Sequence, residues 1–311
     1  MKPSIKAVSY LTIAPAIILL AAACGGGGPD VGCSGGPVRV VVTLPVFADF
    51  ACRVGGDRVT VTALIPPDAD PHTFAPEDEA ASEIKAANLI LYNGLALEQP
   101  ATDFILHHAR GTAQLIAYAG SVPSPSAPQQ APPITAQAAG DNPHLWLDVE
   151  AAKVYVDATR DSLEIVDPDG TAEYRQRTDA YLAELTALAQ EIEQAVGSIP
   201  DTQRRLVTSH DSFPHFARRS GMEVLGFLAL TAEDTPTQGQ LDALVDKAVD
   251  AGLGAVFADR GPDSSVMEQI AVRAGAALCS LYSDQVDEAA DTYIEMMRAN
   301  AQELVRCLKG S

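Results

Sequence analysis

Three of the six histidines in the chain occupy positions where they could bind a metal ion. His72 lies in a proline-stiffened loop after a predicted strand, His144 lies in a second loop, and His210 stands at the carboxyl end of another predicted strand. Asp284 follows the last predicted strand in the same way. Open α/β sheets present ligand groups at the carboxyl ends of their strands. Three neutral imidazoles and one carboxylate suit a borderline-soft dication such as Zn²⁺, which accepts tetrahedral nitrogen and oxygen ligands.

The remaining histidines are interpreted as structural residues. Two of them are adjacent within a predicted amphipathic helix, and the third lies five residues past a candidate ligand; they are His107, His108 and His215. Three aspartates flank the candidate ligands, namely Asp70, Asp148 and Asp211. They could orient the imidazole rings, or they could cap turns and helices. Trp146 is expected to pack beside His144 and to fix its loop.

Strand and helix patterns alternate along the chain with short connections, which is the signature of parallel α/β layers. The predicted strands are residues 38–44, 59–65, 89–92, 113–116, 205–208, 224–228, 255–258 and 276–281. The predicted helices between them are residues 47–54, 78–87, 98–109, 149–165, 213–220, 237–251 and 263–274, and a last helix reaches residue 309. The expected fold class is therefore α/β, with two (β/α) lobes that each contain a mainly parallel sheet.

One long helix is expected to join the two lobes. Residues 171–196 contain neither proline nor glycine, and their apolar side chains recur at helical spacing. At about 1.5 Å per residue, this segment forms a rigid rod of roughly 39 Å. The predicted division is an N-terminal lobe at 38–170, a linking helix at 171–197 and a C-terminal lobe at 198–311. Within the first lobe, residues 120–140 are rich in proline and are expected to form a mobile surface loop.

The N-terminal residues have the features of an export signal. A basic start and an apolar stretch at 1–23 predict a signal peptide, which is too short to span a membrane comfortably. The segment Leu20–Cys24 resembles a bacterial lipoprotein processing site, so Cys24 is the predicted lipid anchor and 24–37 a Gly-rich tether. The formal net charge is −20, which argues against nucleic acid as a partner because phosphate binding needs a basic patch.

Four cysteines remain besides Cys24, and sequence alone allows three ways to pair them. Cys279 ends an apolar predicted strand and Cys307 lies in the last helix, so this pair is favoured. The pairing of Cys33 with Cys52 has weaker support. An exported chain reaches a compartment that permits disulfides. Because no two cysteines have the spacing CxxC, thiolate binding of a metal is not expected.

Several motifs in the same order resemble the zinc and manganese solute-binding proteins of ABC importers, cluster A-I. These motifs are Val41–Pro45, Gly55–Asp57, Asp70–Phe74, Tyr92–Leu95, Pro143–Asp148 and Ser209–Phe213. The resemblance implies two (β/α) lobes joined by one rigid helix, with the metal buried in the cleft between them. The ligands that it implies are His72, His144, His210 and Asp284, two from each lobe. The resemblance also implies that members that bind manganese have a glutamate as the third of these ligands, whereas members that bind zinc have a histidine. His210 therefore favours the zinc branch.

The expected function is therefore an exported, membrane-anchored lipoprotein, monomeric, that captures Zn²⁺ and delivers it to the permease of an ABC importer. The rigid helix predicts small rearrangements on binding rather than a wide hinge motion. Alternatives are a receptor for manganese or iron, and a surface adhesin with a structural metal. An enzyme would need an open position on the metal for water, as would arise if Asp284 did not bind. The sequence contains no HExxH helix to support that alternative, so the protein is not expected to be an enzyme.

Overall fold

A computed structural model of the protein describes residues 32–109, 111, 113–121, 142–229, 235–261 and 264–309. The predicted signal peptide, the predicted lipid anchor Cys24, most of the tether and nearly all of the loop at 120–140 lie outside the described residues. Among the residues that are described, no helix combines the length and the apolar character needed to cross a membrane.

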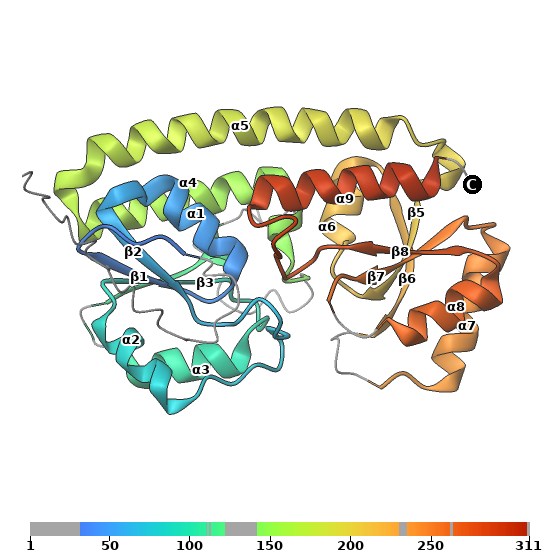
Figure 1. Ribbon diagram of the computed structural model, residues 1–311, viewed down its shortest axis with the longest axis horizontal. Helices are drawn as coiled ribbons and strands as arrows, with labels where there is room; N and C mark the ends of the chain where they lie inside the picture. Colours follow the sequence, from blue (N-terminus) through green and yellow to red (C-terminus); the bar gives the residue numbers. More distant parts are fainter. Residues whose placement is uncertain are drawn as a thin grey trace, which may run out of the picture.

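The N-terminal sheet has four parallel strands in the order β2-β1-β3-β4. The strands are β1 (Val38–Val42), β2 (Val59–Ala63), β3 (Leu89–Tyr92) and β4 (Gln114–Ala117). The helices are α1 (Pro45–Gly55), α2 (Ala81–Ala86), α3 (Gln99–His108) and α4 (Val149–Val166). Figure 1 shows α1 and α4 on one face of this sheet and α2 and α3 on the other. Four of the five residues of β1 are valines, which suits a strand that helices cover on both faces.

The C-terminal sheet repeats this plan with the order β6-β5-β7-β8, again fully parallel. Its strands are β5 (Arg205–His210), β6 (Glu223–Ala229), β7 (Ala255–Asp259) and β8 (Ala277–Leu281). Its helices are α6 (Pro214–Ser220), α7 (Gln238–Asp250), α8 (Ser265–Ala274) and α9 (Tyr293–Leu308). Short 3₁₀ helices occur at Gly56–Arg58, Asp78–Ala80, Tyr118–Ser121, Leu145–Leu147, Pro168–Gly170 and Asp201–Gln203.

Helix α5 (Thr171–Gly197) lies across both lobes on the side where α4 and α9 also run (Figure 1). Its buried side chains recur at helical spacing from Tyr174 to Val196, so one stripe of the helix faces the lobes. Polar contacts also hold it, because the Tyr181 hydroxyl donates to Asp49 Oδ2 over 2.8 Å. The predicted fold class, two parallel α/β lobes with a long helix between them, is confirmed.

One hydrophobic core runs through both lobes beneath α5. A single cluster of buried side chains contains Phe47 and Trp146 from the N-terminal half together with Phe216 and Leu281 from the C-terminal half. Two separate clusters cover only the outer faces of the sheets, under α2 and α3 and under α7 and α8. Because the inner core is continuous, a wide separation of the lobes would expose buried apolar surface. The lobe boundaries at residues 170 and 198 remain a proposal.

Two disulfides link the described cysteines. Cys279 of β8 is bonded to Cys307 of α9, which agrees with the favoured pairing, and Cys33 is bonded to Cys52 of α1. The first of these attaches the last helix to the C-terminal sheet. The second attaches the segment before β1 to α1.

The predicted elements differ from the observed ones mainly at their ends. β1 ends at Val42 rather than residue 44, because Pro45 starts α1 immediately afterwards. The helix predicted at 78–87 is a 3₁₀ turn followed by the shorter α2. β5 continues to His210, beyond the predicted end at 208, and pairs there with Ala229 of β6.

Replacing Phe47 by alanine should lower the free energy of unfolding by about 3–5 kcal/mol. Phe47 is fully buried, and its ring centroid lies 5.0 Å from that of Tyr118, 5.6 Å from Trp146 and 5.7 Å from Tyr155. Denaturant unfolding followed by circular dichroism measures this loss. The control Val272→Ala, at a position 75% exposed, should cost less than about 0.5 kcal/mol. Equal losses in the two variants would contradict the assignment of Phe47 to the shared core.

Candidate metal site

Each of the four predicted ligands is held by the local structure around it. The His72 backbone N–H donates to Asp70 Oδ1 over 2.9 Å, which makes a tight turn after β2. His144 immediately precedes the 3₁₀ helix Leu145–Leu147 that leads into α4. His210 is the last residue of β5, and Asp284 follows β8.

The structure brings all four residues together at the carboxyl ends of the two sheets. One ligand atom from each lies within 4.8 Å of the others. His144 Nε2 is 3.1 Å from His210 Nε2 and 3.3 Å from Asp284 Oδ1, and His210 Nε2 is 3.6 Å from Asp284 Oδ2. The His72 ring centroid lies 5.4 Å from that of His144 and 5.7 Å from that of His210. His72 is partly exposed and the other three residues are buried.

Hydrogen bonds on the far side of two rings determine which nitrogen faces the centre. His144 Nδ1 donates to Asn142 Oδ1 over 2.9 Å, and the Asn142 amide is oriented because its nitrogen donates to the Asp211 carbonyl. His210 Nδ1 donates to Asp259 Oδ2 over 2.6 Å. A neutral imidazole that donates from Nδ1 carries a lone pair on Nε2. When both rings are neutral, their Nε2 lone pairs face each other across 3.1 Å and can bind one cation; without a metal, a proton on one Nε2 forms a hydrogen bond to the other across the same distance.

The charges around the site are consistent with an acceptor for cations. Burial and the nearby imidazoles of His210 and His72 hold the pKa of His144 well below its usual value. Burial also lowers the pKa of His210, but its ion pair with Asp259 outweighs burial and raises that pKa to about 9. Burial raises the pKa of Asp284 to about 7. In the absence of a metal, a proton on His210 therefore balances the carboxylate of Asp259.

The cavity among these side chains is small. It has a volume of about 20 Å³ and is lined by Asp70–His72, His210, Asp259 and residues 283–285, with Arg260 beside them. This space corresponds to about one water-sized body. A second cavity of about 260 Å³ lies just outside it and shares Arg260 and Gln285 with it. The inner cavity has room for an ion but not for an organic substrate.

Other residues singled out in the sequence have structural contacts. Trp146 packs against His144, with ring centroids 5.3 Å apart, and donates from Nε1 to the Ser283 carbonyl over 3.0 Å. Asp148 caps α4 by accepting from the Glu150 N–H over 3.0 Å. His215 Nε2 donates to the Asn142 carbonyl over 2.7 Å. His107 and His108 pack against each other at the end of α3, outside the cluster.

Two residues that orient the site were missed in the sequence. Asn142 accepts the hydrogen bond from Nδ1 of His144, and Asp259 accepts the one from Nδ1 of His210. Asp259 follows the apolar run 255–258 directly and is the last residue of β7. A polar residue at the carboxyl end of a buried strand is a signal that could have identified it.

Comparison with known proteins assigns the family. A family model described as zinc-uptake complex component A, periplasmic (ZnuA), matches residues 40–307. The chain belongs to the ZnuA family. As a member of this family, it is a substrate-binding protein of a metal ABC transporter and not an enzyme. Its predicted extracytoplasmic location is likewise confirmed.

Relatives of this ZnuA family member differ in the metal that they are named for. The manganese-binding lipoprotein MntA of Halalkalibacterium halodurans is 28% identical over 304 residues, which cover 96% of this chain and 98% of that protein. The zinc-binding protein TroA of Treponema pallidum is 28% identical over 291 residues, which cover 91% of this chain and 92% of that protein. The metal itself is therefore not settled by family membership.

Solved structures of related proteins share the fold. The periplasmic zinc-binding protein TroA from Treponema pallidum aligns with a TM-score of 0.79 at 26% identity, covering 88% of this chain and 99% of that one. The manganese-bound periplasmic metal-binding protein from Candidatus Liberibacter asiaticus aligns with a TM-score of 0.74 at 21% identity, covering 87% of this chain and 99% of that one.

Replacing Asp259 by asparagine should lower the affinity for the metal by about 10- to 100-fold. Asparagine keeps the size of the side chain but removes the charge that orients His210 and favours its interaction with a cation. Competition against a chromophoric chelator measures the affinity. Asp242→Asn, which removes an exposed carboxylate on α7, serves as the control and should leave the affinity unchanged. An Asp259→Asn variant with unaltered affinity would show that Asp259 has no part in positioning the ligand.

Proposed function

We propose that this ZnuA family protein captures Zn²⁺ with His72, His144, His210 and Asp284 and delivers it to the permease of an ABC importer. The observation that carries the proposal is that His144 Nε2 lies 3.1 Å from His210 Nε2 and 3.3 Å from Asp284 Oδ1, beside a cavity of about 20 Å³ that His72, His210 and Asp284 line. Three nitrogen ligands and one oxygen ligand can complete a tetrahedral shell around zinc.

The donor set favours zinc over manganese. Mn²⁺ is better suited by carboxylate, carbonyl and water oxygens, whereas imidazole suits zinc. The ligands here are three histidines and one aspartate. By the family resemblance, His210 stands at the position where manganese-binding members have a glutamate. A manganese receptor is the second candidate, because a relative of equal identity to this chain is named a manganese-binding lipoprotein.

The proposed delivery step uses the membrane anchor at Cys24. Lipidation of this cysteine after removal of residues 1–23 would keep the protein at the extracytoplasmic face of the membrane, and relatives of this chain are named lipoproteins. Residues 24–37 would then serve as the tether to the first strand. Radiolabelled fatty acid incorporated by the natural chain but not by a Cys24→Ala variant tests this step.

Metal analysis of the protein tests the proposed cargo. Protein purified without added metal should contain zinc at close to one equivalent, and competition titration should rank Zn²⁺ above Mn²⁺. Preferential retention of Mn²⁺ in the competition would assign the protein to manganese transport instead.

Replacing His210 by alanine should lower the affinity for Zn²⁺ by orders of magnitude and leave the fold intact, because a metal–nitrogen bond is lost from the shell. His107→Ala, at an exposed histidine outside the cluster, is the matched control and should bind zinc as the natural protein does. His210→Glu should shift the preference toward Mn²⁺ because it replaces a nitrogen ligand by an oxygen ligand. Unchanged zinc binding by the alanine variant would remove His210 from the ligand set.

A further inference from the structure

The turn after β3 holds its backbone in a strained conformation. Gly94, Leu95 and Ala96 all have positive φ angles, of 86°, 53° and 58°. Glycine adopts such angles readily, whereas leucine and alanine rarely do, because their Cβ then crowds the backbone carbonyl oxygen. Non-glycine residues in this region persist only where surrounding contacts determine them, and such positions gather at functional sites. Other contacts must therefore hold this turn.

Glu98, at the start of α3, supplies these contacts from a buried position. It is 1% exposed and accepts hydrogen bonds from the Asn93 N–H over 2.6 Å, the Thr43 hydroxyl over 2.9 Å and the Gly94 N–H over 3.3 Å. Burial raises the pKa of this carboxyl group. Because Thr43 directly follows β1 and Asn93 directly follows β3, the carboxyl group of Glu98 joins the ends of two neighbouring strands.

Asn93 connects this turn to the segment that carries His144. The residue is fully buried, and its Nδ2 donates to the carbonyl of Pro143 over 2.9 Å, one residue before the ligand. Because proline has no N–H, this carbonyl is the only polar group by which Pro143 can be held. The Oδ1 of Asn93 accepts from the Tyr155 hydroxyl of α4 over 2.7 Å. The orientation of the amide is therefore determined at both of its ends.

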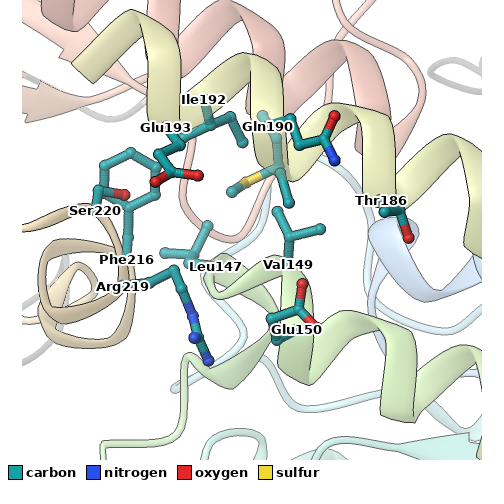
Figure 2. Close-up of a pocket in the computed structure, with 12 residues that line it drawn as sticks. Leu147, Val149, Glu150, Thr186, Gln190, Ile192, Glu193, Phe216, Arg219 and Ser220 are labelled. Atoms are coloured by element: carbon teal, nitrogen blue, oxygen red, sulfur yellow. The ribbon is translucent and has the colours of Figure 1, made fainter. Parts of the chain in front are cut away.

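The segment that follows His144 borders open space. A pocket of about 570 Å³ lies between the start of α4, α5, α6 and α9. Figure 2 shows Leu147 and Val149 in its lining. Side chains beside such a space lack the contacts that would fill it. Directed hydrogen bonds such as the one from Asn93 therefore take a larger part in fixing the backbone near His144.

We propose that Asn93 is a positioning residue for His144 and that Glu98 fixes Asn93 in the required orientation. Whereas Asn142 orients the imidazole ring, Asn93 sets the place of the backbone from which the ring extends. The N-terminal sheet thereby keeps His144 Nε2 3.1 Å from His210 Nε2, where both nitrogens can bind the same ion. This inference rests on the proposed metal site.

Metal binding by the variant Asn93→Ala tests the positioning role. Its affinity for Zn²⁺, measured by competition against a chromophoric chelator, should fall by about 10- to 100-fold, the range typical of partners behind the ligands. The visible absorption spectrum of the variant loaded with Co²⁺ should also change, because that spectrum depends on the ligands and their geometry. A loss of stability alone leaves the spectrum of the fully loaded protein unaltered. A Co²⁺ spectrum identical to that of the natural chain would overturn the proposal, whatever the affinity.

Tyr155→Phe tests the same contact with less disturbance of the fold. It keeps the ring and removes only the hydroxyl that orients the Asn93 amide. Zinc affinity should fall by about threefold to tenfold, less than for a direct partner of a ligand. Tyr118→Phe is the matched control, because it removes another buried tyrosine hydroxyl, one that bonds to Thr159 over 2.7 Å, and should leave zinc affinity unchanged. Equal affinities in the two variants would overturn the proposal.

A double-variant cycle tests whether Glu98 acts through Asn93. Glu98→Gln keeps the size of the side chain but replaces one acceptor oxygen by an amide nitrogen. It should lower zinc affinity by about tenfold in the natural chain and by less than about twofold in Asn93→Ala, because residues of one network are not additive. Additive losses would show that Glu98 does not act through Asn93. Failure of the proposed function is a different result, in which the natural chain itself binds neither Zn²⁺ nor Co²⁺.

Discussion

The imidazoles of His144 and His210 face each other through Nε2 across 3.1 Å, and this contact constrains the rest of the structure. Each ring holds its orientation because Nδ1 donates to a fixed acceptor, Asn142 in one case and Asp259 in the other. Those acceptors belong to different lobes, so both lobes have to keep their relative position for the rings to meet. The long helix α5 and the continuous core beneath it maintain that position.

The fold could be predicted from the sequence because each helix and strand is indicated by the residue types within its own segment. The four valines of β1 and the twenty-seven residues of α5 without an internal break each predict one kind of element. The ends of elements were harder to predict. β1 ends earlier than expected because α1 begins at Pro45. The first residues of the helix expected at 78–87 form a 3₁₀ turn instead.

The candidate ligands were identifiable because parallel sheets present them at a common edge, and their motifs resemble those of a known family. Their partners were not identifiable in the same way. Trp146 and Ser283 are 137 residues apart in the sequence. Because every residue has a backbone carbonyl, a hydrogen bond to a carbonyl does not restrict the residue type that accepts it. Asp259 reaches His210 only because β7 lies beside β5, and that strand order is a property of the assembled sheet.

Trp146 is the only tryptophan in the chain, and its indole lies against the ring of His144 while its N–H bonds to the residue before Asp284. The ultraviolet emission of the folded protein therefore comes mainly from one indole next to the cluster. A charge that arrives beside this indole alters its electrostatic surroundings directly. The protein thus contains its own optical reporter of occupancy, and loading could be followed in real time without a label.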